Sequence, residues 1–226
     1  MTENLQRLIH PAGVIGIFGA GKFGVAIARR ALDVGYGVKI ATSGPIEKTT
    51  RIAGIAAPAA VESTAANLAR GTDLILLAVP LHRFRELPLL QFAGHVVIDM
   101  MNYWPRVDGA LPEFERSTTP TSVLVRDALP STARLVKTIN HLSYHQIEDL
   151  ARPSGSRDRT AIAISGDDPD AVRLAATVVD RLGFDPVPAG NLLASAALQP
   201  GSALFGANLD AATMRRVLDA NRTTAA

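Results

Sequence analysis

The sequence contains no cysteine, which excludes disulfide bonds, thiolate metal sites and a cysteine nucleophile. It has no marked excess of one charge either, because 23 Lys and Arg against 21 Asp and Glu leave a net charge of +2. The basic residues are scattered along the chain rather than gathered in one stripe, so the sequence indicates no nucleic-acid partner.

Long hydrophobic runs are also missing. The run Leu74–Leu81 is far shorter than the roughly 20 residues of a membrane span. The apolar stretch Ala12–Gly21 is glycine-rich, is followed by Lys22 and is preceded by Glu3, a pattern that does not fit a signal peptide. We therefore expect a cytoplasmic protein with no membrane partner.

The distribution of hydrophobic residues predicts one α/β domain. A chain of 226 residues, 47% of them hydrophobic, is long enough for a single domain with its own core. Short apolar runs of strand length alternate with helical patterns, which is typical of a parallel sheet covered by helices on both faces. The predicted strands are residues 14–18, 38–42, 74–79, 96–99, 134–140 and 160–165, with short strands near Val61 and from Val187.

This order predicts a Rossmann-type, doubly wound and mostly parallel sheet with a small C-terminal helical extension. We expect residues 1–226 to form a single NAD(P)-binding domain, with the dinucleotide-binding core at 14–140 and additional strands and C-terminal helices at 141–226. Helices are predicted at 83–92, at 169–182 after an N-cap at Asp167 or Asp168, and from about Leu192 onward.

A G-x-G-x-x-G string lies at the junction of the first predicted strand and helix and reads Gly19-Ala20-Gly21-Lys22-Phe23-Gly24. In this position Gly19 permits a tight turn, Gly21 lets the backbone approach a pyrophosphate, and Gly24 lets the helix pack closely on the strand. The helix N-terminus then binds the phosphates. The alternative is a glycine-rich turn that holds no ligand.

The residues after the second predicted strand favour NADP(H) over NAD(H). In NAD-binding members of this fold, an acidic residue roughly 20 positions after the glycines binds the ribose hydroxyls. Here that region contains Thr42, Ser43 and Gly44, followed by Lys48 and Arg51. Hydroxyls and a cation bind a 2′-phosphate, which a carboxylate would repel. The alternative is that Lys48 and Arg51 belong to a solvated face.

Three further segments are expected at the carboxyl edge of the sheet, where ligands bind in such folds. Ala78-Val79-Pro80 follows one strand, Met101-Asn102 follows another, and Thr138 to Asn140 follow a third. The amides of Asn102 and Asn140 suit hydrogen bonds to a nicotinamide or a ribose. The alternative is that both are buried asparagines that satisfy loop backbone.

No catalytic acid or base stands out, and we predict no metal site. His141 and His145 have the i, i+4 spacing of two zinc ligands, but Leu142 stands where an H-E-x-x-H site has Glu. A reaction that passes hydride directly between two bound cofactors needs orientation more than proton transfer. The absence of an evident acid or base fits such a reaction.

These motifs together resemble the family of NADPH-dependent F-420 (deazaflavin) reductases, which is related to the cytosolic domain of the six-transmembrane metalloreductases. The resemblance extends from Val14 to about Asn208. It is carried by Ile17–Gly24, Ile40–Ser43, Leu77–Pro80, Val97–Asp99, Val136–Asn140, Ser165–Pro169, Leu182–Phe184 and Ala189–Gly190.

The resemblance implies a homodimer in which the C-terminal segment helps to close the acceptor site. It places NADP contacts at 20–23, Thr42, Ser43, Val79 and Thr138. The sequence departs from the family in two places. Residues 18–21 read Phe-Gly-Ala-Gly where deazaflavin reductases usually read Gly-Gly-Thr-Gly, and Ser43 replaces the arginine that normally binds the 2′-phosphate.

We therefore expect an NADP(H)-dependent oxidoreductase that transfers hydride between NADPH and F-420 or a flavin-like acceptor, so that its partner is a small-molecule redox carrier. One alternative is an imine or carbonyl reductase of the pyrroline carboxylate reductase type. Such enzymes normally append a long helical dimerisation domain, whereas this chain continues with predicted strands at Arg134 and Thr160. The other alternative is a non-catalytic NADP(H)-binding sensor.

Overall fold

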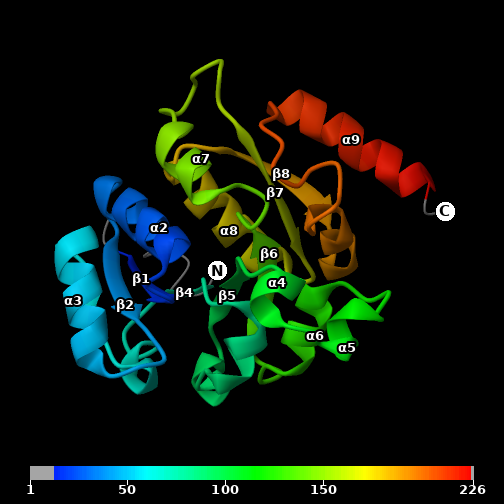
Figure 1. The fold of residues 1–226 in the computed structure, drawn as a ribbon. Helices are drawn as coiled ribbons and strands as arrows, with labels where there is room; N and C mark the ends of the chain where they lie inside the picture. Colours follow the sequence, from blue (N-terminus) through cyan, green and yellow to red (C-terminus); the bar gives the residue numbers. More distant parts are fainter. Residues whose placement is uncertain (1–12, 225–226) are drawn as a thin grey trace.

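The computed structural model describes residues 13–224, with side chains up to Asn221, and contains one mixed sheet (Figure 1). The sheet has eight strands in the order β3-β2-β1-β4-β5-β6-β7-β8. All neighbouring strands are parallel except β6 and β7, which are antiparallel. The strands are β1 (Val14–Phe18), β2 (Gly37–Ala41), β3 (Val61–Glu62), β4 (Leu74–Leu77), β5 (Val96–Asp99), β6 (Arg134–Thr138), β7 (Ala161–Gly166) and β8 (Asp185–Gly190).

Helical segments connect the strands. The α-helices are α2 (Lys22–Asp33), α3 (Ile46–Ala56), α4 (Pro105–Asp108), α5 (Pro112–Glu115), α6 (Thr121–Asp127), α7 (Tyr144–Asp149), α8 (Pro169–Arg181) and α9 (Ala211–Thr224). The 3-10 segments are η1 (Ala65–Asn67), η2 (Leu81–Glu86), η3 (Leu89–Phe92) and η4 (Leu192–Leu198).

Both faces of the sheet are covered, because alternate strand residues enter different cores. Leu74 and Leu76 of β4 pack in the core that includes α2, α7 and α8. Ile75 and Leu77 of the same strand pack in the core that includes η2 and α6. A third core joins β7 and β8 to α9, which lies alongside β8 in Figure 1. Successive residues of a strand point to opposite faces, so the two large cores lie on the two sides of the sheet. Together with α9, this arrangement confirms the predicted doubly wound α/β fold with a C-terminal helical extension.

Two of the predicted helices are wrong. Residues 83–92 do not form one α-helix but belong to η2 and η3, which are separated by Pro88, a residue that cannot continue a helix. The segment from Leu192 onward is also not continuously helical, because the chain leaves η4 before α9 begins.

The cap of α8 is Asp168 rather than Asp167. Asp168 Oδ1 accepts a hydrogen bond of 2.7 Å from the Ala171 backbone N–H. Asp167 instead accepts the Leu192 backbone N–H at 2.9 Å and pairs with Arg126 at 3.1 Å. The two neighbouring aspartates therefore hold different segments of the chain: Asp168 fixes the start of α8, and Asp167 fixes the start of η4.

Candidate functional site

The glycine string forms the turn between β1 and α2, and its three glycines have different surroundings. Gly19 has φ +115°, and a Cβ there would lie 2.3 Å from the Ala78 carbonyl oxygen. A Cβ on Gly24 would lie 1.9 Å from the Gly19 carbonyl oxygen. A Cβ on Gly21 would meet nothing within 4 Å. The turn is therefore tightly packed on its inner side and open at Gly21.

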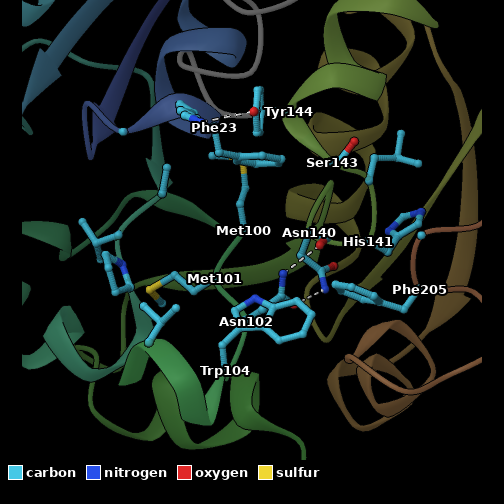
Figure 2. A pocket seen from close by; sticks show the side chains of 18 of the residues that line it. Phe23, Met100, Met101, Asn102, Trp104, Asn140, His141, Ser143, Tyr144 and Phe205 are labelled. Carbon is cyan, nitrogen blue, oxygen red and sulfur yellow. Dashed lines mark hydrogen bonds between the residues drawn. The ribbon is translucent and has the colours of Figure 1, made fainter. Parts of the chain in front are cut away.

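The open side of this turn borders a cleft of about 460 Å³ at the carboxyl edge of the sheet (Figure 2). Phe23 and Tyr144 lie at one end of the cleft, Trp104 and Phe205 at the other, and Met100 between them. The Trp104 and Phe205 rings meet edge to face with centroids 5.4 Å apart. The residues that line the cleft are Gly21, Lys22, Phe23, Ala78, Val79, Pro80, Met100, Met101, Asn102, Trp104, Val107, Asp108, Asn140, His141, Leu142, Ser143, Tyr144, Gln146, Phe205 and Gly206.

Eight of the predicted site residues line this cleft: Gly21, Lys22, Phe23, Ala78, Val79, Pro80, Asn102 and Asn140. The structure places four others behind its wall, namely Gly19, Ala20, Gly24 and Thr138. Thr138 is fully buried, and its hydroxyl donates a hydrogen bond of 2.9 Å to the Ala163 carbonyl of β7. A ligand could accept a hydrogen bond from the Thr138 hydroxyl only if this bond broke.

The remaining predicted residues lie outside the cleft, Thr42 and Ser43 directly after β2 and Lys48 in the first turn of α3. The Thr42 hydroxyl is 2.9 Å from the Thr49 hydroxyl and accepts the Gly44 backbone N–H at 3.4 Å. Ser43 and Lys48 are exposed to solvent. The end of β2 therefore presents a hydroxyl and a cation to solvent, although Glu47 also stands in the first turn of α3.

Asn102 and Asn140 bind each other and the backbone across the cleft. Asn102 Nδ2 donates to the Asn140 carbonyl at 2.8 Å, and Asn140 Nδ2 donates to Asn102 Oδ1 at 2.9 Å and to the Leu198 carbonyl at 2.7 Å. The preceding residue, Ile139, has φ +67°, a strained value for a β-branched side chain and the only positive φ at a non-glycine residue of 13–224. These bonds fix the shape of the cleft floor, and of the side-chain nitrogen and oxygen atoms of these two asparagines only Asn140 Oδ1 has no hydrogen-bond partner.

A buried ion pair lies beside this floor. Lys137 Nζ is 3.2 Å from Asp99 Oδ2, and both side chains are at most 1% exposed. Burial lowers the pKa of Lys137, and the Asp99 carboxylate opposes this shift. The ammonium also donates to the Met101 carbonyl, and Asp99 further accepts the Ser122 hydroxyl at 2.8 Å. The pair thus ties the carboxyl ends of β5 and β6 together.

The two histidines of the predicted i, i+4 pair have different environments. His141 is buried and precedes α7, whereas His145 is exposed within α7, so the two do not share a helical face. Burial lowers the pKa of His141 to about 4, the charge of Lys137 acts in the same direction, and a hydrogen bond with the Ala161 backbone opposes both. His141 is therefore neutral at pH 7. Within residues 13–224 no group of three acidic or histidine side chains is placed to hold a metal ion.

Several lining residues were not predicted from the sequence, above all the aromatic ones. Trp104 follows β5, Tyr144 begins α7, and Phe205 comes from the loop after η4. Asp108 was also missed: its carboxylate accepts the backbone N–H groups of Trp104 and His82 at 2.7 and 3.1 Å, and it pairs with the His82 ring at 2.8 Å. No spacing rule connects these positions, because the folded chain alone brings them together.

The doubly wound sheet, the tight glycine turn and the cleft at the carboxyl edge define a Rossmann-type α/β fold. Residues 14–103 match the family described as NADP oxidoreductase, coenzyme F420-dependent. This match confirms, for that part of the chain, the family resemblance predicted from the sequence.

Comparison with solved structures supports the same fold over nearly the whole chain. The hypothetical protein SMa0349 from Sinorhizobium meliloti is 25% identical, with a TM-score of 0.72 over 92% of this chain and 98% of that chain. A protein from Arthrobacter sp. FB24, named as a proposed F420-dependent NADP-reductase, is 22% identical, with a TM-score of 0.67 over 92% of this chain and 94% of that chain. At these identities the likeness is evidence of the fold.

One curated relative matches a shorter segment. YjhV of Escherichia coli (strain K12) is 44% identical over 64 residues, which is 28% of this chain and 47% of that protein. The chain thus spans about half the length of the curated relative that it matches. No helix in the described part of the chain is long and apolar enough to cross a membrane.

Proposed function

We propose that the protein is an NADP(H)-dependent oxidoreductase that transfers hydride between NADPH and a flat aromatic acceptor, the deazaflavin F-420 or a flavin. The observation that carries this proposal is one continuous cleft that begins at the open glycine turn and ends between aromatic side chains. The match of residues 14–103 to the NADP oxidoreductase family supports the same reaction class.

The phosphate end of the cleft fits a dinucleotide. Gly21 leaves space where any Cβ would stand, the first turn of α2 contains no acidic residue, and no side chain caps that turn. The free N–H groups and the positive end of the α2 dipole would hold the diphosphate at Gly21, Lys22 and Phe23. Gly19, Ala20 and Gly24 would shape this turn without touching the ligand.

The end of β2 would distinguish NADPH from NADH. Thr42, Ser43 and Lys48 would hold the 2′-phosphate through hydroxyl groups and one ammonium. No carboxylate occupies the positions of Thr42, Ser43 and Gly44, where NAD-binding proteins of this fold carry an acid. Thr138 would support the floor through its bond to Ala163 rather than bind the cofactor directly.

The other end of the cleft would orient the reacting rings. NADPH supplies the hydride when bound. Ala78, Val79 and Pro80 would form one wall. Met100 and Met101 would form the floor together with the paired asparagines Asn102 and Asn140, which make it polar on one side. Trp104 and Phe205 would exclude water from the rings and present flat apolar surfaces to an acceptor. This arrangement suits transfer between two stacked planar molecules.

An imine or carbonyl reductase of the pyrroline carboxylate reductase type is the alternative acceptor class. The strands predicted after residue 134 are present as β6, β7 and β8, but they do not separate the two acceptor classes, because solved structures of a reductive aminase and a pyrroline-5-carboxylate reductase match 84% and 78% of this chain and so extend into this region. A homodimer remains a prediction from the family resemblance.

The test is a spectrophotometric assay of the purified full chain with NADPH, and separately NADH, against oxidised F-420, FMN, riboflavin and a cyclic imine. We expect reduction of F-420 or a flavin, with NADPH preferred over NADH. Turnover of the imine alone would overturn the choice of acceptor. Tight NADPH binding without turnover of any acceptor would overturn the enzymatic proposal and favour a sensor.

A further inference from the structure

Lys22 and Tyr144 meet across the mouth of the cleft from two helices that are far apart in the sequence. Lys22 Nζ lies 3.4 Å from Tyr144 Oη, at the dashed line in Figure 2, and 5.3 Å from the centroid of the Tyr144 ring. Lys22 is the first residue of α2 and Tyr144 the first residue of α7. Both line the cleft at the glycine turn.

The position of Tyr144 is fixed by its own helix. Ser143 caps α7 by accepting the Gln146 backbone N–H at 3.2 Å, and the Gln146 side chain accepts the Ser143 backbone N–H at 2.8 Å. This reciprocal capping box holds the first turn of α7 rigidly. The ring of Tyr144 therefore offers a fixed surface on which the long Lys22 side chain rests.

The pair presents hydrogen-bond donors and a positive charge to the cleft. Because Lys22 Nζ donates to Tyr144 Oη, the phenolic proton of Tyr144 remains available to another acceptor. No carboxylate within residues 13–224 pairs with Lys22. The one carboxylate that lines the cleft, Asp108, is engaged by Trp104 and His82. An anion at the mouth would thus meet donors on both sides.

We propose that Lys22 and Tyr144 form a clamp that closes over the diphosphate of the dinucleotide. In this clamp the Lys22 ammonium and the Tyr144 hydroxyl donate to phosphate oxygens opposite the N–H groups of α2. Tyr144 also positions the ammonium through its ring. The cofactor is then held by both halves of the sheet, by α2 after β1 and by α7 after β6. This inference rests on the proposed function.

The consequence concerns domain organisation. The sequence places the dinucleotide-binding core at 14–140, whereas the clamp assigns a cofactor contact to Tyr144 in the segment 141–226. Packing of α7 against α2 would then be part of the binding site, since a shift of either helix would separate the two donors. The clamp binds the diphosphate, which NADPH and NADH share. It therefore contributes affinity for both nucleotides without distinguishing them.

The experiment measures the dissociation constants of NADPH and NADH by isothermal titration of the full chain and its variants. Lys22→Ala should weaken both nucleotides about tenfold, equivalent to about 1.4 kcal/mol, because a charge-assisted bond is lost. Tyr144→Phe, which keeps the ring, should weaken both about threefold. The double variant should lose less than the product of the two factors, because the side chains are coupled.

A matched control breaks another contact between the same helices. Arg29 of α2 and Glu148 of α7 form an ion pair of 3.1 Å, and neither residue lines the cleft. Glu148→Gln should leave both dissociation constants unchanged. If Glu148→Gln weakened nucleotide binding as much as Lys22→Ala does, the affinity would depend on the packing of α7 against α2 rather than on the two donors. That result would overturn the clamp.

The remaining outcomes separate this inference from the proposed function. Wild-type affinity for both nucleotides in Lys22→Ala and Tyr144→Phe would overturn the clamp while leaving NADPH binding intact. Weakening of NADPH alone by Lys22→Ala would place Lys22 at the 2′-phosphate and overturn the clamp as well. Failure of the wild-type chain to bind either nucleotide would instead refute the proposed function.

Discussion

The glycine turn predicts that stability and cofactor affinity can be changed separately, by placing one methyl group at Gly24 or at Gly21. At Gly24 the added Cβ would stand 1.9 Å from the Gly19 carbonyl oxygen, closer than any real Cβ contact, so the backbone must move by more than 1 Å. Overpacking of this kind destabilises a protein by roughly 1–3 kcal/mol.

At Gly21 the same methyl group meets no protein atom. The position has φ −75° and ψ 179°, which alanine adopts without strain, and nothing lies within 4 Å of the added Cβ. Replacing Gly21 by alanine removes a favourable N-cap residue, which lowers the stability of the fold. It also reduces the conformational freedom of the unfolded chain, which raises the stability, so the net change in the free energy of unfolding stays within about 1 kcal/mol. The methyl group would, however, occupy the space in which the diphosphate approaches the backbone.

Thermal unfolding and NADPH titration of the Gly24→Ala and Gly21→Ala variants test this prediction. We expect Gly24→Ala to lower Tm by roughly 4–8 °C, the shift that about 2 kcal/mol produces in a chain of this size. Gly21→Ala should keep Tm within about 3 °C of the wild type and weaken NADPH binding at least tenfold, which is about 1.4 kcal/mol. A Gly21→Ala variant that binds NADPH as tightly as the wild type would refute the placement of the diphosphate.

Three further predictions concern charge. Asp99→Asn should lower the free energy of unfolding in urea by roughly 3–5 kcal/mol, because it leaves the buried Lys137 ammonium without a counter-charge; a loss below about 1 kcal/mol would contradict the ion pair. His141, with a pKa lowered from 6.5 to about 4, takes up a proton more readily when unfolded. Stability should therefore fall as the pH drops from 6.5 to 4, by about 3 kcal/mol in total, and His141→Gln should lack this part of the pH dependence. Ser43→Asp should weaken NADPH at least tenfold and change NADH little, and unchanged NADPH affinity would contradict a 2′-phosphate site at the end of β2.

The strands could be predicted because a parallel strand buried on both faces reads as an unbroken apolar run. Leu74–Leu77 and Val96–Ile98 are such runs, and all of their residues are buried. The glycine spacing was equally informative, because each glycine meets a different steric demand at the turn. Local sequence could therefore predict the sheet and one end of the site.

The other end of the cleft could not be predicted, because no local pattern connects its residues. Trp104 and Phe205 are brought together only by the fold, with β6, β7 and β8 between them in the chain. Thr138, which the family resemblance places among the cofactor contacts, has its hydroxyl bonded to β7. The antiparallel pairing of β6 with β7, which covers this position, is a tertiary feature with no signal of its own in the sequence.

The measurement that tests the central claim most directly uses the single tryptophan of the chain. Trp104 lines the cleft, so a dihydronicotinamide bound there should quench its fluorescence by energy transfer. Titration with NADPH and with NADH should give saturable quenching by both, with NADPH reaching half-saturation at a lower concentration. Unchanged Trp104 fluorescence at saturating concentrations of both nucleotides would contradict the assignment of the cleft to NADP(H).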